Sequence, residues 1–563
     1  MPSLRTTVWI SSLAHLQPEN GSLGRALNFW LDNMPIGLSV RLLLLSFIVV
    51  WTSFQFIAFS SVGLHPDMLE TYSWGLHPSA GYYKHPPLSG LIAGAWFSLF
   101  PPSDWAFHLL AMTNGAAGLY AADLIARRHL KGDKRLVALM FLLLTPFYQF
   151  HAERFGSNQV LLSTWPIATY CFLRAFETRG LVWSACAGAA AALAMLGKYY
   201  SIFLIAGFVV AALTHPARLA YLRSPSPWLS AAVGLVMLAP HVHWLITNAW
   251  MPFTYAVAVH GGAPLYQVLW KDAVYVLEAC LYVALPVSAY AMAVRPSSAL
   301  LRETLWPHDH DARLLAVVLY TPLILPAVVA PFIGAQLTAL WTMPGWFLLP
   351  VLLLRPPEAS ITRVTAIRIV MLVVVTTIGS LGAAPWVAWR YGHYGTKEYR
   401  EFYRLAAAEA ADAWHRTTSS PLRIVGGDLY LVAAMTFYDP HHPDSVPTFA
   451  LAAAPWVTEQ RLGSEGFAAI CLASDENCIA EAKRRGIGRN NTSFADFSTN
   501  NGYRNQRFFL LIVPPRPEAG LGIIESRRAA TLAVCMSDAP YSVPGCGWKA
   551  QLASPDGRRV SVT

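Results

Sequence analysis

The sequence predicts a polytopic α-helical membrane protein with a small soluble α/β domain at its C-terminal end. Hydrophobic residues make up 55% of the 563 positions and charged residues only 13%, whereas a soluble globular protein carries about 25% charged residues. Apolar runs at this chain length indicate many membrane spans rather than one large core. These values argue against a soluble enzyme, a disordered chain and a disulfide-rich miniprotein.

The density of charge changes near residue 390. Residues 1–390 contain 38 charged side chains, and the 173 residues of 391–563 contain 35. The second segment is nearly neutral, with 18 basic and 17 acidic residues. The net charge of +9 therefore comes mainly from the apolar part, which argues against a nucleic-acid binder. We predict a multi-span membrane domain at 1–390 and a soluble domain at 391–563.

Eleven segments are apolar enough to be read as membrane-spanning helices, which need roughly 20 mostly apolar residues. They lie near 40–60, 107–126, 135–150, 159–176, 181–197, 200–214, 227–246, 273–294, 313–333, 336–354 and 366–388. Fifteen of the 23 basic residues before position 390 fall in five alternate connectors. The positive-inside rule predicts that these connectors and the N-terminus face the cytoplasm, with the soluble domain on the outer side.

The connector at 61–106 is the longest on the predicted outer side of the membrane domain. It is rich in Pro, Trp, Tyr and His, and its apolar stretch at 88–100 is too short to span a bilayer. We therefore expect interfacial or juxtamembrane helices in this loop.

The segment 391–563 alternates predicted strands with predicted helices, which is typical of a small α/β domain. The strands are expected at Leu422–Gly426, Phe467–Ala473 and Arg507–Val513, and the helices at Tyr399–Ala413 and Cys478–Arg485.

Four cysteines lie in the predicted outer domain: Cys471, Cys478, Cys535 and Cys546. An oxidising compartment would favour two disulfides there, and four cysteines allow three pairings. The pairing of nearest neighbours in sequence is Cys471–Cys478 with Cys535–Cys546. Metal ligation is the weaker interpretation, because the spacings are not those of a Cys-x-x-Cys site.

The loop at 61–106 holds the first candidate catalytic residues. Asp67 and Glu70 are three positions apart, so a short helix would present both on one face, where one could act as a general base. A solvated pair on a surface helix is the alternative, and spacing alone does not separate the two. Lys84 and His85 precede Pro86-Pro87, a rigid segment that would hold a cation at a fixed height for a phosphate or carboxylate.

An acid at the end of the first span, followed by Gly81-Tyr-Tyr-Lys-His-Pro-Pro-Leu88, resembles the family 39-type membrane glycosyltransferases. The likeness is greatest to the rhizobial galacturonosyltransferases that modify lipopolysaccharide; protein O-mannosyltransferases and the lipid A aminoarabinose transferase are more distant relatives. It extends over roughly 40–390, through the segments 151–158, 196–200, 240–248 with His260, and 339–344.

This resemblance implies the GT-C architecture and an inverting glycosyltransferase of a bacterial inner membrane. Such an enzyme moves a sugar from a polyprenyl-phosphate donor to a periplasm-facing lipid A, lipopolysaccharide or other envelope glycan. Asp67 stands where the family has its base and is favoured over Glu70 for that role, with Glu70 and Glu153 assisting. Many relatives have adjacent Asp-Glu here, whereas this chain has Asp67-Met68. A polyprenyl-linked sugar flippase or transporter, or a non-catalytic scaffold with a degenerate site, are the alternatives.

Other polar residues on the predicted outer side are candidates for substrate binding. Lys198 could simply extend to the interface, but an outer-side cation also suits a lipid phosphate. Asn158 stands where many relatives carry an acid, so we expect it only to bind. The full set is Tyr83, Lys84, His85, Glu153, Arg154, Asn158, Lys198, Tyr199, His243, Asn248 and His260.

No cofactor is expected with certainty, and no residue is assigned as a metal ligand. His241, His243 and His260 could hold a divalent cation, because His-x-His is a known ligand spacing. The resemblance makes this the less favoured interpretation. The expected partners are the lipid-linked donor, a lipid or polysaccharide acceptor, and the bilayer itself.

Overall fold

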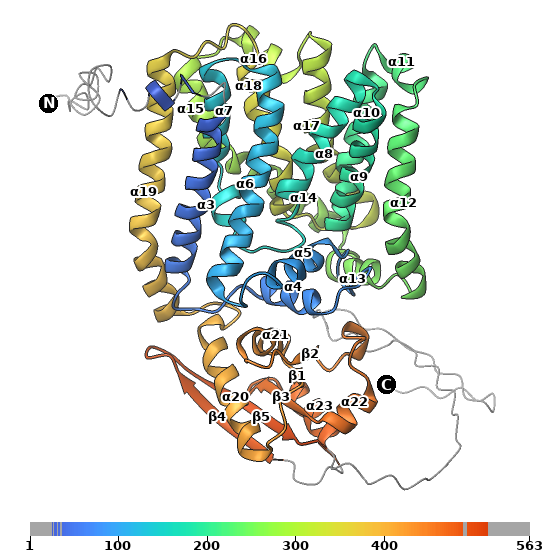
Figure 1. Cartoon of the computed structure of the whole chain (residues 1–563), viewed down its shortest axis with the longest axis vertical. Coiled ribbons are helices and arrows are strands. Elements are labelled where there is room, and N and C mark those ends of the chain that lie inside the picture. Colours follow the sequence, from blue (N-terminus) through green and yellow to red (C-terminus); the bar gives the residue numbers. More distant parts are fainter. Residues whose placement is uncertain (1–24, 26–27, 31, 34–36, 488–492, 516–563) are drawn as a thin grey trace, which may run out of the picture. The chain divides into compact units, whose positions relative to one another are not determined.

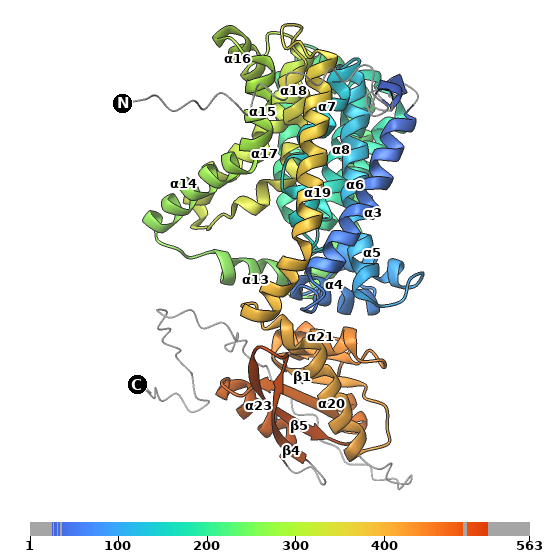
Figure 2. The same ribbon diagram turned by 90° about the vertical axis from the view of Figure 1, so that its left-hand side faces the viewer.

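The computed structural model describes residues 25, 28–30, 32–33, 37–487 and 493–515. These described residues belong to one compact unit. Within it, a bundle of apolar helices carries a five-stranded sheet region at one end (Figures 1 and 2). The two short helices of the 61–106 loop lie at that same end.

The bundle consists of helices that run through most of the first 394 residues. They are α3 (Leu38–Ala58), α4 (Pro66–Leu76), α5 (Leu88–Phe97), α6 (Asp104–His129), α7 (Asp133–Leu143), η1 (Phe147–His151), α8 (Leu161–Thr178), α9 (Leu181–Gly197), η2 (Tyr199–Ser201), α10 (Ile202–Thr214), α11 (Arg218–Leu222), α12 (Ser226–Thr247), α13 (Met251–His260), α14 (Leu265–Tyr282), α15 (Ala284–Val294), α16 (Ser298–Leu305), α17 (His310–Ile333), η3 (Ala339–Leu348), α18 (Leu349–Leu354) and α19 (Arg363–Tyr394).

Five of the described helices, α3, α6, α12, α17 and α19, are long and apolar enough to cross a membrane. A sixth span results if α14 and α15, which meet at a 50° bend, are taken together. Each of the eleven expected segments overlaps at least one helix, and several of these helices are shorter than a full span. The multi-pass helical architecture is therefore confirmed, and the number of eleven spans stays a prediction.

The loop at 61–106 contains two short helices, α4 and α5, as its sequence predicted, and their position beside the membrane stays a prediction. Pro66 occupies the first turn of α4, where a missing N–H costs nothing, and Nδ1 of His65 accepts the backbone N–H of Asp67. The two helices cross at glycines: a Cβ on Gly75 would lie 2.7 Å from the backbone nitrogen of Gly94, and one on Gly94 would lie 2.5 Å from the carbonyl oxygen of Gly75. This close crossing fixes the position of α4.

The sheet region follows α19 and has the strand order β2-β1-β3-β5-β4. Strand β1 is parallel to β2 and β3, and β5 is antiparallel to β3 and β4. The elements are η4 (Arg400–Phe402), α20 (Tyr403–Thr417), β1 (Ile424–Gly427), α21 (Leu429–Tyr438), β2 (Asp444–Pro447), η5 (Leu451–Ala453), α22 (Glu459–Glu465), β3 (Phe467–Leu472), α23 (Glu476–Gly486), β4 (Ser493–Asn500) and β5 (Asn505–Val513).

The three predicted strands and two predicted helices of this region match β1, β3, β5, α20 and α23, with shifts of a few residues at their ends. The elements α21, α22, β2 and β4 were not predicted from the sequence. Because the sheet region belongs to the same compact unit as the bundle, the domain boundary at 390 stays a prediction.

A disulfide joins Cys471 at the end of β3 to Cys478 in α23. It confirms the first bond of the nearest-neighbour pairing and ties the helix to the sheet. Cys535 and Cys546 lie outside the described residues.

A Gly94→Ala substitution is expected to destabilise the protein, because the added methyl group would meet the backbone of α4 at the crossing. Overpacking of this kind costs roughly 1–3 kcal/mol. Gly379→Ala in α19 is the matched control, since a Cβ there meets nothing within 4 Å and alanine favours a helix over glycine. Thermal unfolding of the purified variants in one detergent would test this. Equal melting temperatures would contradict a tight α4–α5 crossing.

Candidate active site

The two acids of α4 have different surroundings. Glu70 accepts from two donors on the 81–85 loop: its Oε1 lies 2.8 Å from Nζ of Lys84 and 2.8 Å from the hydroxyl of Tyr83. The side chains of Glu70 and Lys84 are only 14% and 10% exposed. Burial disfavours the charged form of Lys84, but Glu70 outweighs this and holds the pKa of Lys84 well above its usual range. Glu70 is therefore committed to an ion pair.

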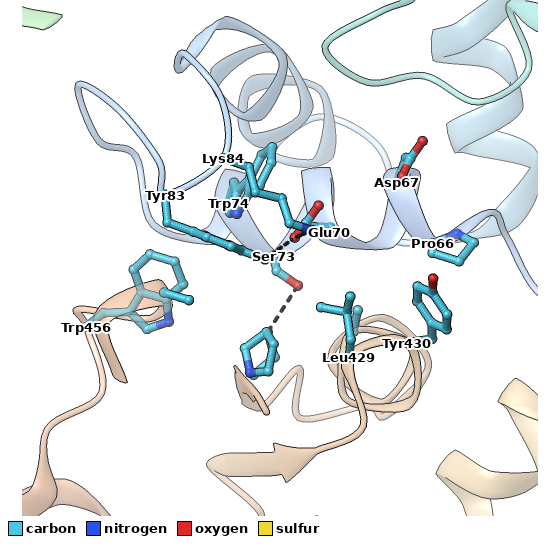
Figure 3. Close-up of a pocket in the computed structure, with 14 residues that line it drawn as sticks. Pro66, Asp67, Glu70, Ser73, Trp74, Tyr83, Lys84, Leu429, Tyr430 and Trp456 are labelled. Atoms are coloured by element: carbon cyan, nitrogen blue, oxygen red, sulfur yellow. Dashed lines mark hydrogen bonds and ion pairs between the residues drawn. The ribbon is translucent and has the colours of Figure 1, made fainter. Parts of the chain in front are cut away.

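Among the described residues, no Lys or Arg forms an ion pair with the carboxylate of Asp67. Its side chain is 58% exposed, and its ion-pair neighbour is His65, with Nδ1 at 3.6 Å from Oδ2. Burial, Arg154 and Arg400 lower the pKa of His65 to about 2, so this histidine is neutral. Figure 3 shows the Asp67 side chain pointing away from α21. Asp67 is thus the acid of α4 that can accept a proton.

Three cations lie near Asp67. Enclosure by protein raises the pKa of its carboxyl, while Lys84, Arg154 and Lys198 draw it downward. These three residues come from three separate connectors, all of which are predicted from the sequence to lie on the outer side. The carboxylate therefore lies in a recess that reaches water yet carries a positive potential.

Lys198 lies in the sharp connection between α9 and η2. Its Nζ donates to Oδ1 of Asn158 at 2.5 Å and lies 4.6 Å from the ring centre of Trp341. Burial lowers the pKa of Lys198 to about 7, although Asp67 acts in the opposite direction. Neither contact neutralises the ammonium group, so its charge is available to an anion and changes near neutral pH.

His85 is surrounded by the same cations. Burial, followed by Lys198, Lys84 and His260, lowers the pKa of His85 well below its usual value. A neutral imidazole can donate or accept a hydrogen bond without adding charge. The His260 ring in turn packs against Trp341, with centroids 5.1 Å apart. The structure thus brings Lys84, His85, Lys198 and His260 to one place.

The segment after η1 contributes Glu153 and Arg154. Glu153 is 2% exposed, and its Oε1 accepts from Nε of Arg154 at 3.2 Å. Its Oε2 is buried and has no hydrogen-bond partner among the described residues. Burial raises the pKa of Glu153, and Arg400 is the largest influence in the other direction. The guanidinium of Arg154 is half exposed and can meet a ligand beside Asp67.

The remaining candidates divide into two groups. Tyr199 donates to or accepts from Nε2 of His241 at 2.9 Å, and Nδ1 of His241 lies 2.6 Å from the carbonyl oxygen of Ala80. His241 thereby holds in place the loop that leads to Lys84. His243, by contrast, is exposed, and Asn248 bonds locally to Trp244 and Thr247. These two residues are not brought to the cluster, and their binding roles stay predictions.

Two nearby residues were not among the predicted site residues. Tyr255 of α13 covers Lys84, with its ring centre 5.5 Å from Nζ. Arg400 belongs to the sheet region, yet its Nε donates to the carbonyl oxygen of Gly63 at 2.9 Å, and its own carbonyl accepts from the backbone N–H of Gly63. No motif marked Arg400, because a single arginine in a charged segment has no distinguishing pattern.

A recess separates α4 from the sheet region (Figure 3). Its lining includes Asp67, Glu70 and Lys84 on one side and Leu429, Tyr430 and Trp456 on the other. Trp456 stacks on His77 with centroids 4.4 Å apart, and His77 bonds to Asp444 of β2. The sheet region therefore forms one wall of the opening beside the acids. In the described part of the chain, no three His, Cys, Asp or Glu side chains are grouped so as to hold a metal ion.

Arg400→Ala is expected to destabilise the protein by roughly 3 kcal/mol, because removal of a buried cation leaves the Gly63 carbonyl and Glu153 without it. Arg404→Ala is the matched control. The Arg404 side chain is 43% exposed and pairs with Asp104, so its loss should cost about 1 kcal/mol or less. Unfolding midpoints of the two variants in the same detergent would test this. An equal loss of stability in both variants would mean that the buried contacts of Arg400 do not stabilise the fold.

Comparisons with known proteins give a family match for part of the chain and a likeness in fold to solved structures. Residues 84–244 match the family model of the dolichyl-phosphate-mannose-protein mannosyltransferases. ArnT from Cupriavidus metallidurans has a similar structure, both in its apo state and bound to undecaprenyl phosphate, with a TM-score of 0.52 and 14% identity in each case. The bound form covers 83% of this chain and 97% of its own, and the apo form 84% and 97%. No curated protein matches significantly.

The matched segment begins at Lys84 and includes Glu153, Arg154, Asn158 and Lys198. The predicted resemblance to GT-C glycosyltransferases is confirmed, and the rhizobial branch within them stays a prediction. Residues 84–244 thus match a domain of the dolichyl-phosphate-mannose-protein mannosyltransferase type, and the multi-pass helical chain has a fold similar to that of ArnT.

Proposed function

We propose that this protein is an inverting glycosyltransferase that moves a sugar from a polyprenyl-phosphate donor to a hydroxyl group of a periplasm-facing lipid or envelope glycan. One observation carries the proposal: Asp67, an acid with no cation bound to its carboxylate, lies within the field of Lys84, Arg154 and Lys198. An acid that can accept a proton beside cations that can hold a phosphate is the pair of functions that such a transfer needs.

The donor is proposed from the cations and from the relative. ArnT from C. metallidurans binds undecaprenyl phosphate. Lys198 and Lys84 would hold the corresponding phosphate here, with Arg154 at the more open side. Charge-assisted hydrogen bonds to phosphate are among the strongest that proteins make. The prenyl chain would remain in the bilayer between apolar helices.

The reaction proposed is a single displacement. Asp67 accepts the proton of the acceptor hydroxyl, whose oxygen forms a bond to the anomeric carbon of the sugar. The bond between that carbon and the phosphate oxygen breaks, and its electron pair leaves with the polyprenyl phosphate. Lys84 and Lys198 stabilise the negative charge that develops on the phosphate. Attack opposite the leaving group inverts the anomeric centre.

Glu70 acts in this proposal by positioning rather than by taking the proton. It holds the ammonium group of Lys84 through a 2.8 Å ion pair, assisted by the hydroxyl of Tyr83. The Asp67-Met68 sequence, which departs from the adjacent acids of many relatives, is then compatible with catalysis, because the second acid lies one turn away on the same helix.

Two features support an outer-side location of the site. The basic connectors lie at the end of the bundle opposite α4 and α5 (Figure 1), as the positive-inside rule requires if α4 and α5 are outside. The Cys471–Cys478 disulfide lies in the sheet region beside them, and disulfides persist in oxidising compartments such as the periplasm.

Asp67→Asn is expected to lower kcat by 10²–10⁴-fold, the range of a general base, while leaving donor binding nearly unchanged. Glu70→Gln should mainly raise the KM for the donor, because Lys84 loses its anchor. Asp412→Asn, on an exposed face of α20, is the matched control and should keep full activity.

The assay uses protein in nanodiscs, a panel of polyprenyl-phosphate sugars and crude envelope extract as acceptor, with release of free polyprenyl phosphate followed by mass spectrometry. Full activity of the Asp67→Asn variant would refute this mechanism. Movement of lipid-linked sugar across a bilayer without release would favour a flippase, and neither activity would favour a scaffold.

The pH profile of kcat/KM should fall on its basic side as the pH rises through about 7. The pKa of Lys198 is lowered to about 7 in the folded protein, so the ammonium form that holds phosphate is present below that pH and is lost above it. Lys198→Arg should shift the basic limb of the profile to higher pH, because arginine stays charged. An unchanged limb in this variant would show that another group sets it.

A further inference from the structure

A second polar recess lies at the end of the bundle opposite α4 and α5. It is formed where α6 meets α7 and where α18 leads into α19, and both junctions lie at that end in Figures 1 and 2. The recess is open to solvent and has about 860 Å³ of empty volume. An adjoining recess shares His129, Arg355 and Pro357 with it. Neither recess contains a residue of the candidate active site.

The lining has more cations than its acids neutralise. Lys131, Lys134 and Arg355 line the first recess together with a single acid, Asp133. Asp133 is already paired with Arg363, with Oδ2 2.9 Å from Nε. Lys131 has no ion pair to any described residue, and Lys134 donates to the carbonyl oxygen of Pro356 at 2.9 Å. Glu358 attracts Lys134 only at longer range.

Two buried nitrogen atoms at the junction of the two recesses have no acceptor. Nη2 of Arg355 bonds to Asp309 at 2.7 Å, but Nη1 is buried without a hydrogen-bond partner in the described structure. Nε2 of His129 is likewise buried and unpartnered among those residues. Buried polar groups are nearly always satisfied, so these two nitrogens, beside Lys131 and the singly bonded ammonium of Lys134, suit a ligand that supplies acceptor oxygens.

The setting indicates which ligand this is. The connectors that form the recess are among the basic ones that the positive-inside rule assigns to the cytoplasm. The headgroups of the cytoplasmic leaflet lie at this level, and basic pockets between helices on that side bind anionic headgroups. A phosphodiester offers two anionic oxygens and a glycerol stem that can continue into the bilayer.

We propose that the recess formed by His129, Lys131, Lys134 and Arg355 binds the phosphodiester headgroup of an anionic phospholipid. The lysines supply charge, and Nη1 of Arg355 with Nε2 of His129 supply the directed hydrogen bonds. Such a lipid would join the α6–α7 connector to the α18–α19 connector. This site is independent of the proposed glycosyl transfer.

Native mass spectrometry of the full chain would test this site with phosphatidylglycerol and phosphatidylcholine of identical acyl chains. The wild-type protein should retain phosphatidylglycerol in preference to phosphatidylcholine. Each lysine near the headgroup is worth about fivefold in affinity, so Lys131→Gln with Lys134→Gln should weaken phosphatidylglycerol binding by about 30-fold.

Arg218→Gln with Arg223→Gln is the matched control. It removes the same charge from an exposed connector on the same predicted side, away from the recess. An equal loss in this control would show general surface attraction and overturn the proposal. Displacement of phosphatidylglycerol by millimolar inorganic phosphate would identify a site for soluble phosphate instead and would also overturn it. Retention in inorganic phosphate and in the control, with loss in the lysine variant, would establish the lipid site.

Discussion

Charged side chains are costly inside a bilayer, and this cost decides where the chemistry of the protein can lie. The long helices carry few charges, and the charged groups are gathered at the two ends of the bundle. At one end, α4 and α5 form a layer that holds Asp67, Glu70 and Lys84. At this level a lipid phosphate can meet protein cations while its hydrocarbon chain stays in the membrane.

The different surroundings of Asp67 and Glu70 on α4 follow from the same free-energy cost of burying a charge. A buried ammonium group needs a partner, and Glu70 meets that need for Lys84. Asp67 is then left free of any such cation, although Arg154 and Lys198 are near enough to influence it. One carboxylate fixes a cation and the other is free for proton transfer. In the proposed mechanism, this arrangement separates positioning from base catalysis within a single turn of helix.

The sheet region is part of the site rather than a distant attachment. Arg400 holds Gly63 just before α4, and the hydroxyl of Tyr438 accepts the backbone N–H of Leu64. Asp444 of β2 holds His77 just after α4. Both ends of the helix that carries the acids are therefore tied to elements that follow the last membrane helix. A substitution that breaks these contacts should therefore shift α4 and the two acids that it carries.

The sequence alone determined the multi-pass helical architecture, the short helices of the 61–106 loop and most strands of the sheet region, because hydrophobic periodicity and charge density are local properties. It also identified Lys84, His85 and Lys198 as outer-side candidates, because the loop motif and the positive-inside rule can be read along the chain. The likeness to GT-C enzymes followed from the order of such motifs.

Only the tertiary structure decided which groups meet. The choice of Lys84 as the partner of Glu70 depends on how the 81–85 loop folds back over α4. The contact of Arg400 with Gly63 joins residues 337 positions apart. The exposure of His243 beside the inward-facing His241 depends on how α12 is rotated in the bundle. Such contacts arise from packing between distant segments, and no local pattern in the sequence encodes them.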